Sequence, residues 1–225
     1  MTLLINEIYS NRIICAADRQ ITFKNKKPEK HKKLFDIPYL NGCVSYFGSC
    51  RLNNSRLLWE IIIDFKRKNN SITSLKEFAE KLCSELNLHS CKSLLQKNGT
   101  GVHVCGFNKH IPEFWFIRNI KHMNGWTYYG FDTRFRISEE VSKYQHQLPI
   151  LFSNGDLRPC ITGWNDFSQF ASSMLKSTGK TLTNITDNEL NILVKWKMQA
   201  ISNFYSAMMA KKLISSPIDT QLYKP

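Results

Sequence analysis

The segment TLLINEIYSNRIICAADR, residues 2–19, carries the strongest local pattern in this chain of 225 residues. Two short apolar runs, Leu3 to Ile8 and Arg12 to Ala17, are separated by Tyr9-Ser-Asn11. Ser-Asn is a plausible turn, and apolar runs on either side of a turn are typical of paired strands. We therefore expect a β-hairpin at the start of the chain.

Further strands and four helices are expected downstream. The expected strands are Gln20 to Phe23, Leu34 to Ile37, Gly42 to Phe47, Val102 to Phe107, Glu113 to Ile117, Trp126 to Tyr129, Leu148 to Phe152 and Leu213 to Tyr223, the last near a sheet edge. Apolar residues at spacings of three and four predict helices over Leu52 to Lys68, around Phe78 to Leu88 after a cap at Ser71 or Thr73, over Trp164 to Lys176, and over about Asp187 to Lys212. Thr186 and Glu189 form a capping-box pattern before the last helix.

This order of elements predicts an α+β fold in one domain, residues 1–225, with two packed sheets and helix pairs outside them. A chain with 42% hydrophobic residues is long enough for one well-buried core and too short for two independent ones. It has no apolar stretch of about 18 residues and no basic leader, so we expect neither a membrane span nor a signal peptide, and a cytoplasmic location.

The seven cysteines are scattered and never spaced as CxxC, which predicts reduced core thiols, no metal site and no cofactor. They are Cys15, Cys43, Cys50, Cys83, Cys91, Cys105 and Cys160.

The chain is basic, with 31 Lys and Arg against 18 Asp and Glu, a net charge of +13. The densest basic run, Lys24 to Lys33, stands without any nucleic-acid-binding signature. We interpret it as a solvated loop and expect no nucleic-acid partner, although binding of a polyanion to this run remains an alternative.

The first fifty residues resemble proteasome β-type subunits and their bacterial relatives, a branch of the N-terminal-nucleophile (Ntn) hydrolases. In that family a threonine exposed by processing is followed by Ala-Ala-Asp or Ala-Gly-Asp, then by Lys-Lys-Val or Lys-Lys-Ile, then by a strand ending at glycine. Here Thr2 is followed by Ala16-Ala-Asp-Arg19, Lys32-Lys-Leu-Phe35 and Gly42-Cys-Val-Ser-Tyr-Phe-Gly48. The spacing from Thr2 to Asp18 matches the family, and Lys33 falls one residue early. Ser215-Ser-Pro-Ile-Asp219 resembles the closing strand of bacterial members.

The resemblance implies a four-layer αββα sandwich of two antiparallel sheets and a threonine peptidase or amidohydrolase. Removal of Met1 would let the α-amine of Thr2, which titrates near pH 7.7 to 8.0, serve as base for its own hydroxyl. Lys33 would favour the neutral amine, Asp18 would hold Lys33, and the Gly48 N–H would form the oxyanion hole. The implied partners are a polypeptide substrate, further copies of the chain in a ring, and an ATP-driven unfoldase.

Some features of the sequence depart from the family pattern. The segment that corresponds to the family's Gly-Ser-Gly turn is Ser153-Asn-Gly-Asp156, so Ser153 or Asn154 is the candidate supporting residue. No counterpart is found for the family's Asp with a Ser three residues later. Tyr46-Phe47 is bulkier than the family's small residues and predicts a narrow substrate pocket. A non-catalytic scaffold or binding subunit is therefore the alternative function.

Histidines and aromatic residues of the central strands offer two other kinds of candidate site. His103, His110 and His122 lie near the central strands, but none is spaced with Cys, Asp or Glu as metal ligands are. Aromatic residues of the same strands could stack nucleic-acid bases beside a basic surface, namely Phe114, Trp115, Phe116, Trp126, Tyr128 and Tyr129. Because strand residues alternate between faces, we interpret these aromatics as core between two sheets.

Overall fold

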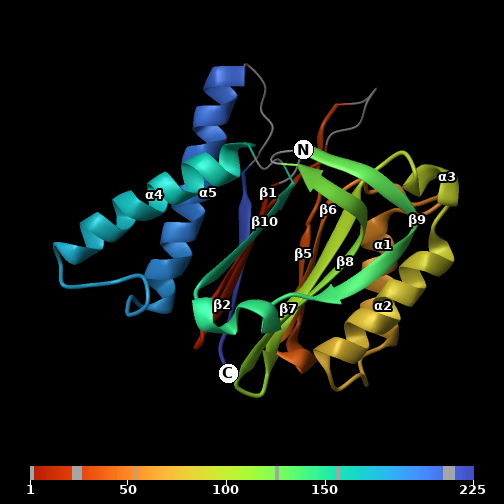
Figure 1. Ribbon diagram of the computed structural model, residues 1–225, viewed down its shortest axis with the longest axis horizontal. Helices are drawn as coiled ribbons and strands as arrows, with labels where there is room; N and C mark the ends of the chain where they lie inside the picture. The colour runs from red at the N-terminus through yellow and green to blue at the C-terminus, as the bar shows by residue number, and fades with distance from the viewer. Residues whose placement is uncertain (1–2, 22–26, 54, 125–126, 156–157, 210–215) are drawn as a thin grey trace.

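The computed structural model describes the chain except for residues 1–2, 22–26, 54, 125–126, 156–157 and 210–215. The described residues form two β-sheets packed face to face, with α4 and α5 covering one outer face and α1 and α2 covering the other (Figure 1). The result is a four-layer αββα sandwich, as the order of elements predicted.

The first sheet contains the N-terminal hairpin in its centre, in the order β10-β1-β2-β11. Its strands are β1 (Leu3–Ile8), β2 (Ile13–Asp18), β10 (Ile150–Gly155) and β11 (Ile218–Tyr223). All three pairings are antiparallel, and β1 and β2 are buried along their whole length. The hairpin expected from residues 2–19 is confirmed, and the last strand lies at the sheet edge as expected.

The second sheet is an antiparallel meander in the order β5-β6-β7-β8-β9. Its strands are β5 (Leu34–Ile37), β6 (Gly42–Gly48), β7 (Thr100–Asn108), β8 (Ile111–Asn124) and β9 (Thr127–Glu139). A short ribbon of β3 (Gln20–Ile21) and β4 (Glu29–Lys30) precedes it. In the first sheet, β1 begins beside the end of β2. In the second sheet, β6 ends beside the starts of β5 and β7. These two sheet ends lie together, because Lys33 before β5 contacts Asp18 at the end of β2.

The helices come in pairs, and each pair follows the strands of one sheet. They are α1 (Leu58–Lys68), α2 (Leu75–His89), the short α3 (Lys92–Leu95), α4 (Arg158–Lys176) and α5 (Asp187–Met209), with 3₁₀ turns at Pro38–Leu40 and Ser142–Gln147. None of the helices in the described part of the chain is long and apolar enough to cross a bilayer.

Three apolar cores hold the layers together. The core between the sheets draws on both, for example Leu4 and Ala17 from the first sheet and Phe47 and Phe114 from the second. A second core joins the five-stranded sheet to α1 and α2, and a third joins β1 and β2 to α4 and α5. Alternate residues of β1 and β2 serve two different cores, which explains why both strands are apolar throughout.

Several expected boundaries were wrong. The first helix begins at Leu58 rather than Leu52, because the Asn53 carboxamide accepts from the N–H groups of Ser55 and Arg56 and closes a turn there. The second helix is capped by Ser74, whose hydroxyl accepts from the N–H of Glu77 at 3.1 Å, rather than by Ser71 or Thr73.

The strands β8 and β9 are much longer than the short segments expected from Glu113 to Ile117 and Trp126 to Tyr129. Residues 132–136 include three charged side chains and only one apolar one, so the sequence does not indicate a strand there. The closing strand begins at Ile218, and the expected strand residues 213–215 lie outside the described part of the chain.

Candidate active site

A buried ion pair lies where the two sheets open at the start of β1. The Lys33 Nζ atom is 3.0 Å from Asp18 Oδ1, and the side chains are 1% and 0% exposed. Lys33 also donates to the backbone carbonyl of Gln20 at 2.5 Å. Asp18 ends β2 and Lys33 immediately precedes β5, so each side chain is held by a strand of a different sheet.

The Asp18 carboxylate also contacts the backbone at the start of β1. Asp18 Oδ1 accepts from the N–H of Leu3 at 2.8 Å, and Oδ2 accepts from the N–H of Gln20 at 2.9 Å. The Lys33 ammonium and the Leu3 amide therefore share one oxygen atom, although they are thirty residues apart in the sequence. Leu3 directly follows Thr2, which lies outside the described residues.

Burial and charge act in opposite directions on Lys33. Loss of hydration lowers the pKa of the ammonium, and the Asp18 carboxylate opposes that shift. Lys32, which the sequence left equally eligible, is exposed. The structure thus distinguishes the two lysines, with Lys33 inside the sandwich and Lys32 at its surface.

Gly48 ends β6 with a φ of +83°, in the region that favours glycine. A Cβ atom at this position would meet the Gly99 carbonyl oxygen at 2.2 Å. The backbone at Gly48 thus requires glycine on steric grounds alone. Gly48 lies at the end of the second sheet where β5 and β7 begin. Lys33 precedes β5 at this same end, and its contact with Asp18 brings it close to Leu3.

The candidate supporting residues lie on β10, beside β1. Ser153 is opposite Ile5 and Asn154 is opposite Leu4. The Asn154 carboxamide does not face the ion pair, since its nitrogen lies 3.1 Å from His103 Nε2 and its oxygen accepts from the Tyr128 hydroxyl at 3.0 Å.

His103 is the centre of a polar network that the sequence did not reveal. Its ring is fully buried between the sheets, and its Nδ1 atom lies 2.8 Å from the amide nitrogen of Asn6. Burial lowers the pKa of His103 to about 3, and the charge of Arg118 acts in the same direction. The imidazole is therefore neutral at physiological pH, and the polar side chains beside it are those of Asn6 and Asn154.

Tyr46 and Phe47, the two bulky residues after Ser45, lie in two different cores. Tyr46 is 2% exposed and packs under α1, where its ring stacks between Phe35 and Trp59. Phe47 is 1% exposed and fills the space above Gly101, where a Cβ atom would meet its ring at 2.3 Å. Both rings are therefore held in the cores, and the narrow substrate pocket stays a prediction.

Two residues near the ion pair were missed at the sequence level. Gln20 supplies a carbonyl to Lys33, and its contribution comes from the backbone, which no side-chain motif records. Cys50 lies close enough for the charges of Arg51 and Lys33 to act on it, while burial, the larger effect, raises the pKa of its thiol. The only signal for Cys50 in the sequence is its position two residues after Gly48.

Comparison with known proteins gives structural matches alone. No protein-family profile and no curated protein sequence matches the chain. HslV from Trypanosoma brucei superposes with a TM-score of 0.52 at 10% identity, covering 99% of each chain. Anbu (ancestral β-subunit) from Yersinia bercovieri gives 0.56 at 11% identity, covering 99% of this chain and 81% of the other. A Gly-1 mutant of Anbu from Hyphomicrobium sp. strain MC1 gives 0.54 at 12% identity, covering 100% and 82%.

The chain has the Ntn-hydrolase fold. The fold expected from the motifs of the first fifty residues is thereby confirmed. Identities of 10 to 12% support the proteasome-like fold and no particular branch of it. In this Ntn-hydrolase fold, the buried Asp18–Lys33 pair and the start of β1 form the candidate active site.

Proposed function

We propose that the protein is a cytoplasmic threonine peptidase or amidohydrolase, with Thr2 as the nucleophile after removal of Met1. The observation that carries this proposal is the buried Lys33 ammonium, which shares Asp18 Oδ1 with the amide of Leu3. A buried lysine with a perturbed pKa beside the start of a chain is the arrangement that an N-terminal nucleophile needs. The mechanism requires the Thr2 hydroxyl to lie within hydrogen-bond reach of Lys33 Nζ.

The proposed reaction proceeds through an ester. The free α-amine of Thr2 takes the proton of the threonine hydroxyl, and the oxygen attacks the substrate carbonyl carbon. The C–N bond then breaks, the amine leaves with that proton, and an acyl ester on Thr2 remains. Water attacks the ester, returns a proton to the threonine oxygen and releases the carboxylic acid.

Asp18, Lys33 and Gly48 have separate roles in this scheme. The positive charge of Lys33 disfavours protonation of the α-amine and so keeps it available as a base. Asp18 holds that ammonium in a site from which water is excluded. The N–H of Gly48 is proposed to donate to the oxyanion, where the lack of a side chain permits close approach.

The proposed substrate is a polypeptide, and the proposed assembly is a homo-oligomeric ring that works with an ATP-dependent unfoldase. Support for self-association comes from apolar side chains exposed on the α4–α5 layer. Phe170, Met174 and Trp196 are 56%, 58% and 42% exposed. Large exposed apolar side chains grouped on one layer are typical of contact surfaces.

A Thr2→Ala variant tests the proposal. We expect it to lose all measurable hydrolysis of fluorogenic peptides, because alanine has no nucleophile. Thr2→Ser should keep part of the activity, and the surface variant Thr183→Ala should keep all of it. Intact mass should show loss of Met1, and native mass should show an oligomer. Retained Met1, or unchanged hydrolysis by Thr2→Ala, would refute the threonine mechanism.

The alternative function is a non-catalytic scaffold. It is favoured by the partners of Asn154, a candidate supporting residue, and of Asp187, the acidic residue at the start of α5. Asp187 pairs with Arg12 at 3.6 Å and with Lys224 at 2.5 Å, and Asn154 belongs to the His103 network. If the mature protein carries a free Thr2 but neither hydrolyses peptides nor forms an adduct with an acylating peptide lactone, the scaffold reading replaces the enzyme.

A further inference from the structure

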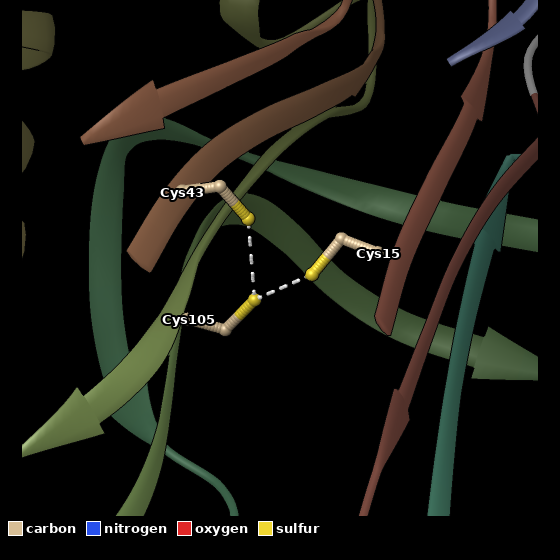
Figure 2. Close-up of side chains that lie close together, drawn as sticks. All are labelled: Cys15, Cys43 and Cys105. Atoms are coloured by element: carbon tan, nitrogen blue, oxygen red, sulfur yellow. Dashed lines mark hydrogen bonds between the residues drawn. The ribbon is translucent and has the colours of Figure 1, made fainter. Parts of the chain in front are cut away.

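Three cysteine side chains from three strands meet between the two sheets (Figure 2). Cys105 Sγ lies 3.2 Å from Cys15 Sγ and 3.6 Å from Cys43 Sγ, and all three sulfur atoms lie within 4.8 Å of one another. Cys15 comes from β2 of the first sheet, and Cys43 and Cys105 face each other on β6 and β7 of the second. Both sheets thus contribute to one cluster.

The cluster is closed to solvent. The three side chains are 0% exposed and belong to the core between the sheets. Two polar side chains approach the cluster: the carboxamide oxygen of Asn6 lies 3.7 Å from Cys105 Sγ, and the Tyr223 side chain interacts with Cys43. Ordinary core packing needs three small apolar side chains, but it gives no reason for three sulfur atoms to point at one another.

We infer that Cys15, Cys43 and Cys105 form a three-coordinate thiolate site for a soft monovalent ion, Cu(I). This site is independent of the proposed peptidase chemistry. Soft sulfur ligands select Cu(I), zinc or iron–sulfur clusters. A metal–sulfur distance of about 2.3 Å places three sulfur atoms of a planar trigonal site roughly 4 Å apart. The separations of 3.2 and 3.6 Å are shorter than that spacing, and the third is no more than 4.8 Å, so small side-chain rotations would complete the site.

The number of ligands separates Cu(I) from zinc. Structural zinc sites in proteins are almost always tetrahedral, with four Cys or His ligands. Among the described residues, no fourth Cys, His, Asp or Glu atom joins the group. Cu(I) is satisfied by two or three sulfur ligands, and its single charge leaves less need for further ligands. Binding releases one proton for each thiol that becomes a thiolate.

Competition with a chelator tests the site. The reduced protein is titrated without oxygen with the coloured Cu(I)–bicinchoninate complex, both folded and during refolding from urea. We expect one Cu(I) per chain to be withdrawn from the chelator. Replacing Cys15, Cys43 or Cys105 singly by alanine should weaken retention at least tenfold. Cys83→Ala, which removes a buried thiol from the core beneath α2, and Cys91→Ser, at the surface, should have no effect.

A second measurement avoids the need for a stable variant. X-ray absorption at the copper edge of the loaded wild-type protein should show three sulfur neighbours and no nitrogen. Fewer than two sulfur neighbours, or equal copper retention by wild type and Cys105→Ala, would overturn the inference. Tighter retention of Zn(II) than of Cu(I) would also overturn it, as would a Cys15–Cys105 disulfide in the protein as isolated.

Discussion

Lys33 is the single residue on which the proposed chemistry depends most closely after Thr2. Its ammonium must stay charged to favour both the neutral α-amine and loss of the Thr2 hydroxyl proton, yet burial lowers its pKa below the ordinary value of about 10.4. Activity should rise as the α-amine loses its proton, at a pH below the free value of 7.7 to 8.0 because the charge of Lys33 favours the neutral amine. It should fall again at a pH below 10.4, about tenfold per unit, as Lys33 loses its own proton.

Lys33→Arg should remove the alkaline decline, because a guanidinium stays charged throughout this range. The measurement is kcat/KM for a fluorogenic peptide as a function of pH. Lys32→Arg, at the exposed neighbouring position, serves as the matched control and should keep the wild-type profile. An alkaline decline that persists in Lys33→Arg would assign it to another group.

His103 makes a separate prediction about acid stability. Its folded-state pKa of about 3 lies far below the value of about 6.5 in an unfolded chain. Between these values the unfolded state binds more protons, so stability falls as the pH falls. Wild type should lose about 2 kcal/mol more than His103→Gln between pH 7 and pH 5, measured by urea unfolding. Equal losses in the two proteins would contradict a neutral His103.

The sequence identified the Asp18–Lys33 pair only as a motif, and it could not separate Lys33 from Lys32. The distinction depends on the strand that begins at Leu34, which directs one lysine inward and leaves the other in solvent. The contacts of His103 could not be predicted from the sequence, for a different reason. Its partners Asn6 and Asn154 lie 97 and 51 residues away, so no local pattern connects them.

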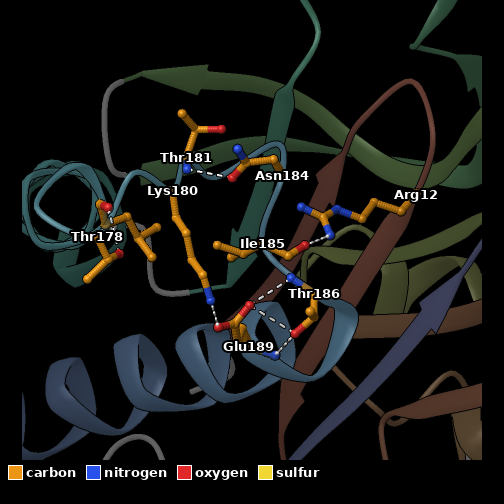
Figure 3. A network of polar contacts seen from close by, with 9 residues as sticks. Arg12, Thr178, Lys180, Thr181, Asn184, Ile185, Thr186 and Glu189 are labelled. Carbon is orange, nitrogen blue, oxygen red and sulfur yellow. Dashed lines mark hydrogen bonds and ion pairs between the residues drawn. The ribbon is translucent and has the colours of Figure 1, made fainter.

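The start of α5 is held by a network of hydrogen bonds and an ion pair (Figure 3). The Thr186 hydroxyl accepts from the N–H of Glu189 at 3.2 Å, and the Glu189 carboxylate accepts from the N–H of Thr186 at 2.8 Å. Lys180 also pairs with Glu189, and the Arg12 guanidinium donates to the carbonyl of Ile185 at 2.6 Å. The capping box expected at Thr186 and Glu189 is confirmed.

Thr186→Ala should destabilise the protein by about 1 kcal/mol, because the first turn of α5 loses its side-chain acceptor. The measurement is the free energy of unfolding in urea. Thr183→Ala is the control, since the Thr183 hydroxyl contacts only the hydroxyl of Thr181 among the partners described, at 2.9 Å. A similar loss in both variants would show that the effect is not specific to the cap.

Strands buried on both faces were predictable from the sequence, and the full lengths of β8 and β9 were not. The apolar runs of β1, β2, β5 and β6 are read directly from the sequence because nearly every residue is buried. In β8 and β9 apolar and charged side chains are mixed: Phe131 and Phe135 pack against the cores. Lys121 and Arg136 both bind Asp132. The register of the pair also shifts between Arg118 and Ile120, so these strands lack the regular alternation that marks a half-buried strand.

Across the whole molecule, a buried polar cluster links the first sheet to the helices over it. Glu7 of β1 accepts from the Trp164 indole at 2.9 Å and from Lys197 Nζ at 2.7 Å. Lys197 is 1% exposed and lies 4.1 Å from the centre of the Trp164 ring. One carboxylate thus holds α4 and α5 on the same strand that begins at the candidate active site.

Lys197→Met should cost about 3 to 5 kcal/mol of stability, because it leaves the Glu7 charge buried without a counter-ion. The double variant Glu7→Gln/Lys197→Met should regain most of that loss, since no buried charge remains. Urea unfolding measures both, and Lys195→Met on the exposed face of α5 provides the control. A double variant no more stable than the single one would contradict the assignment.

The closing strand of the first sheet has a consequence for synthesis of the protein. β11 pairs with β2 so that Ile218 lies opposite Asp18, and Arg19 binds Asp219 across a separation of 200 residues. A ribosome adding about 5 to 20 residues per second needs roughly 10 to 40 s to produce that partner. During this interval the β2 edge has no neighbour on that side, and open edges readily pair with other chains. Completion of the sheet around Asp18 is therefore a late event in the life of each new chain.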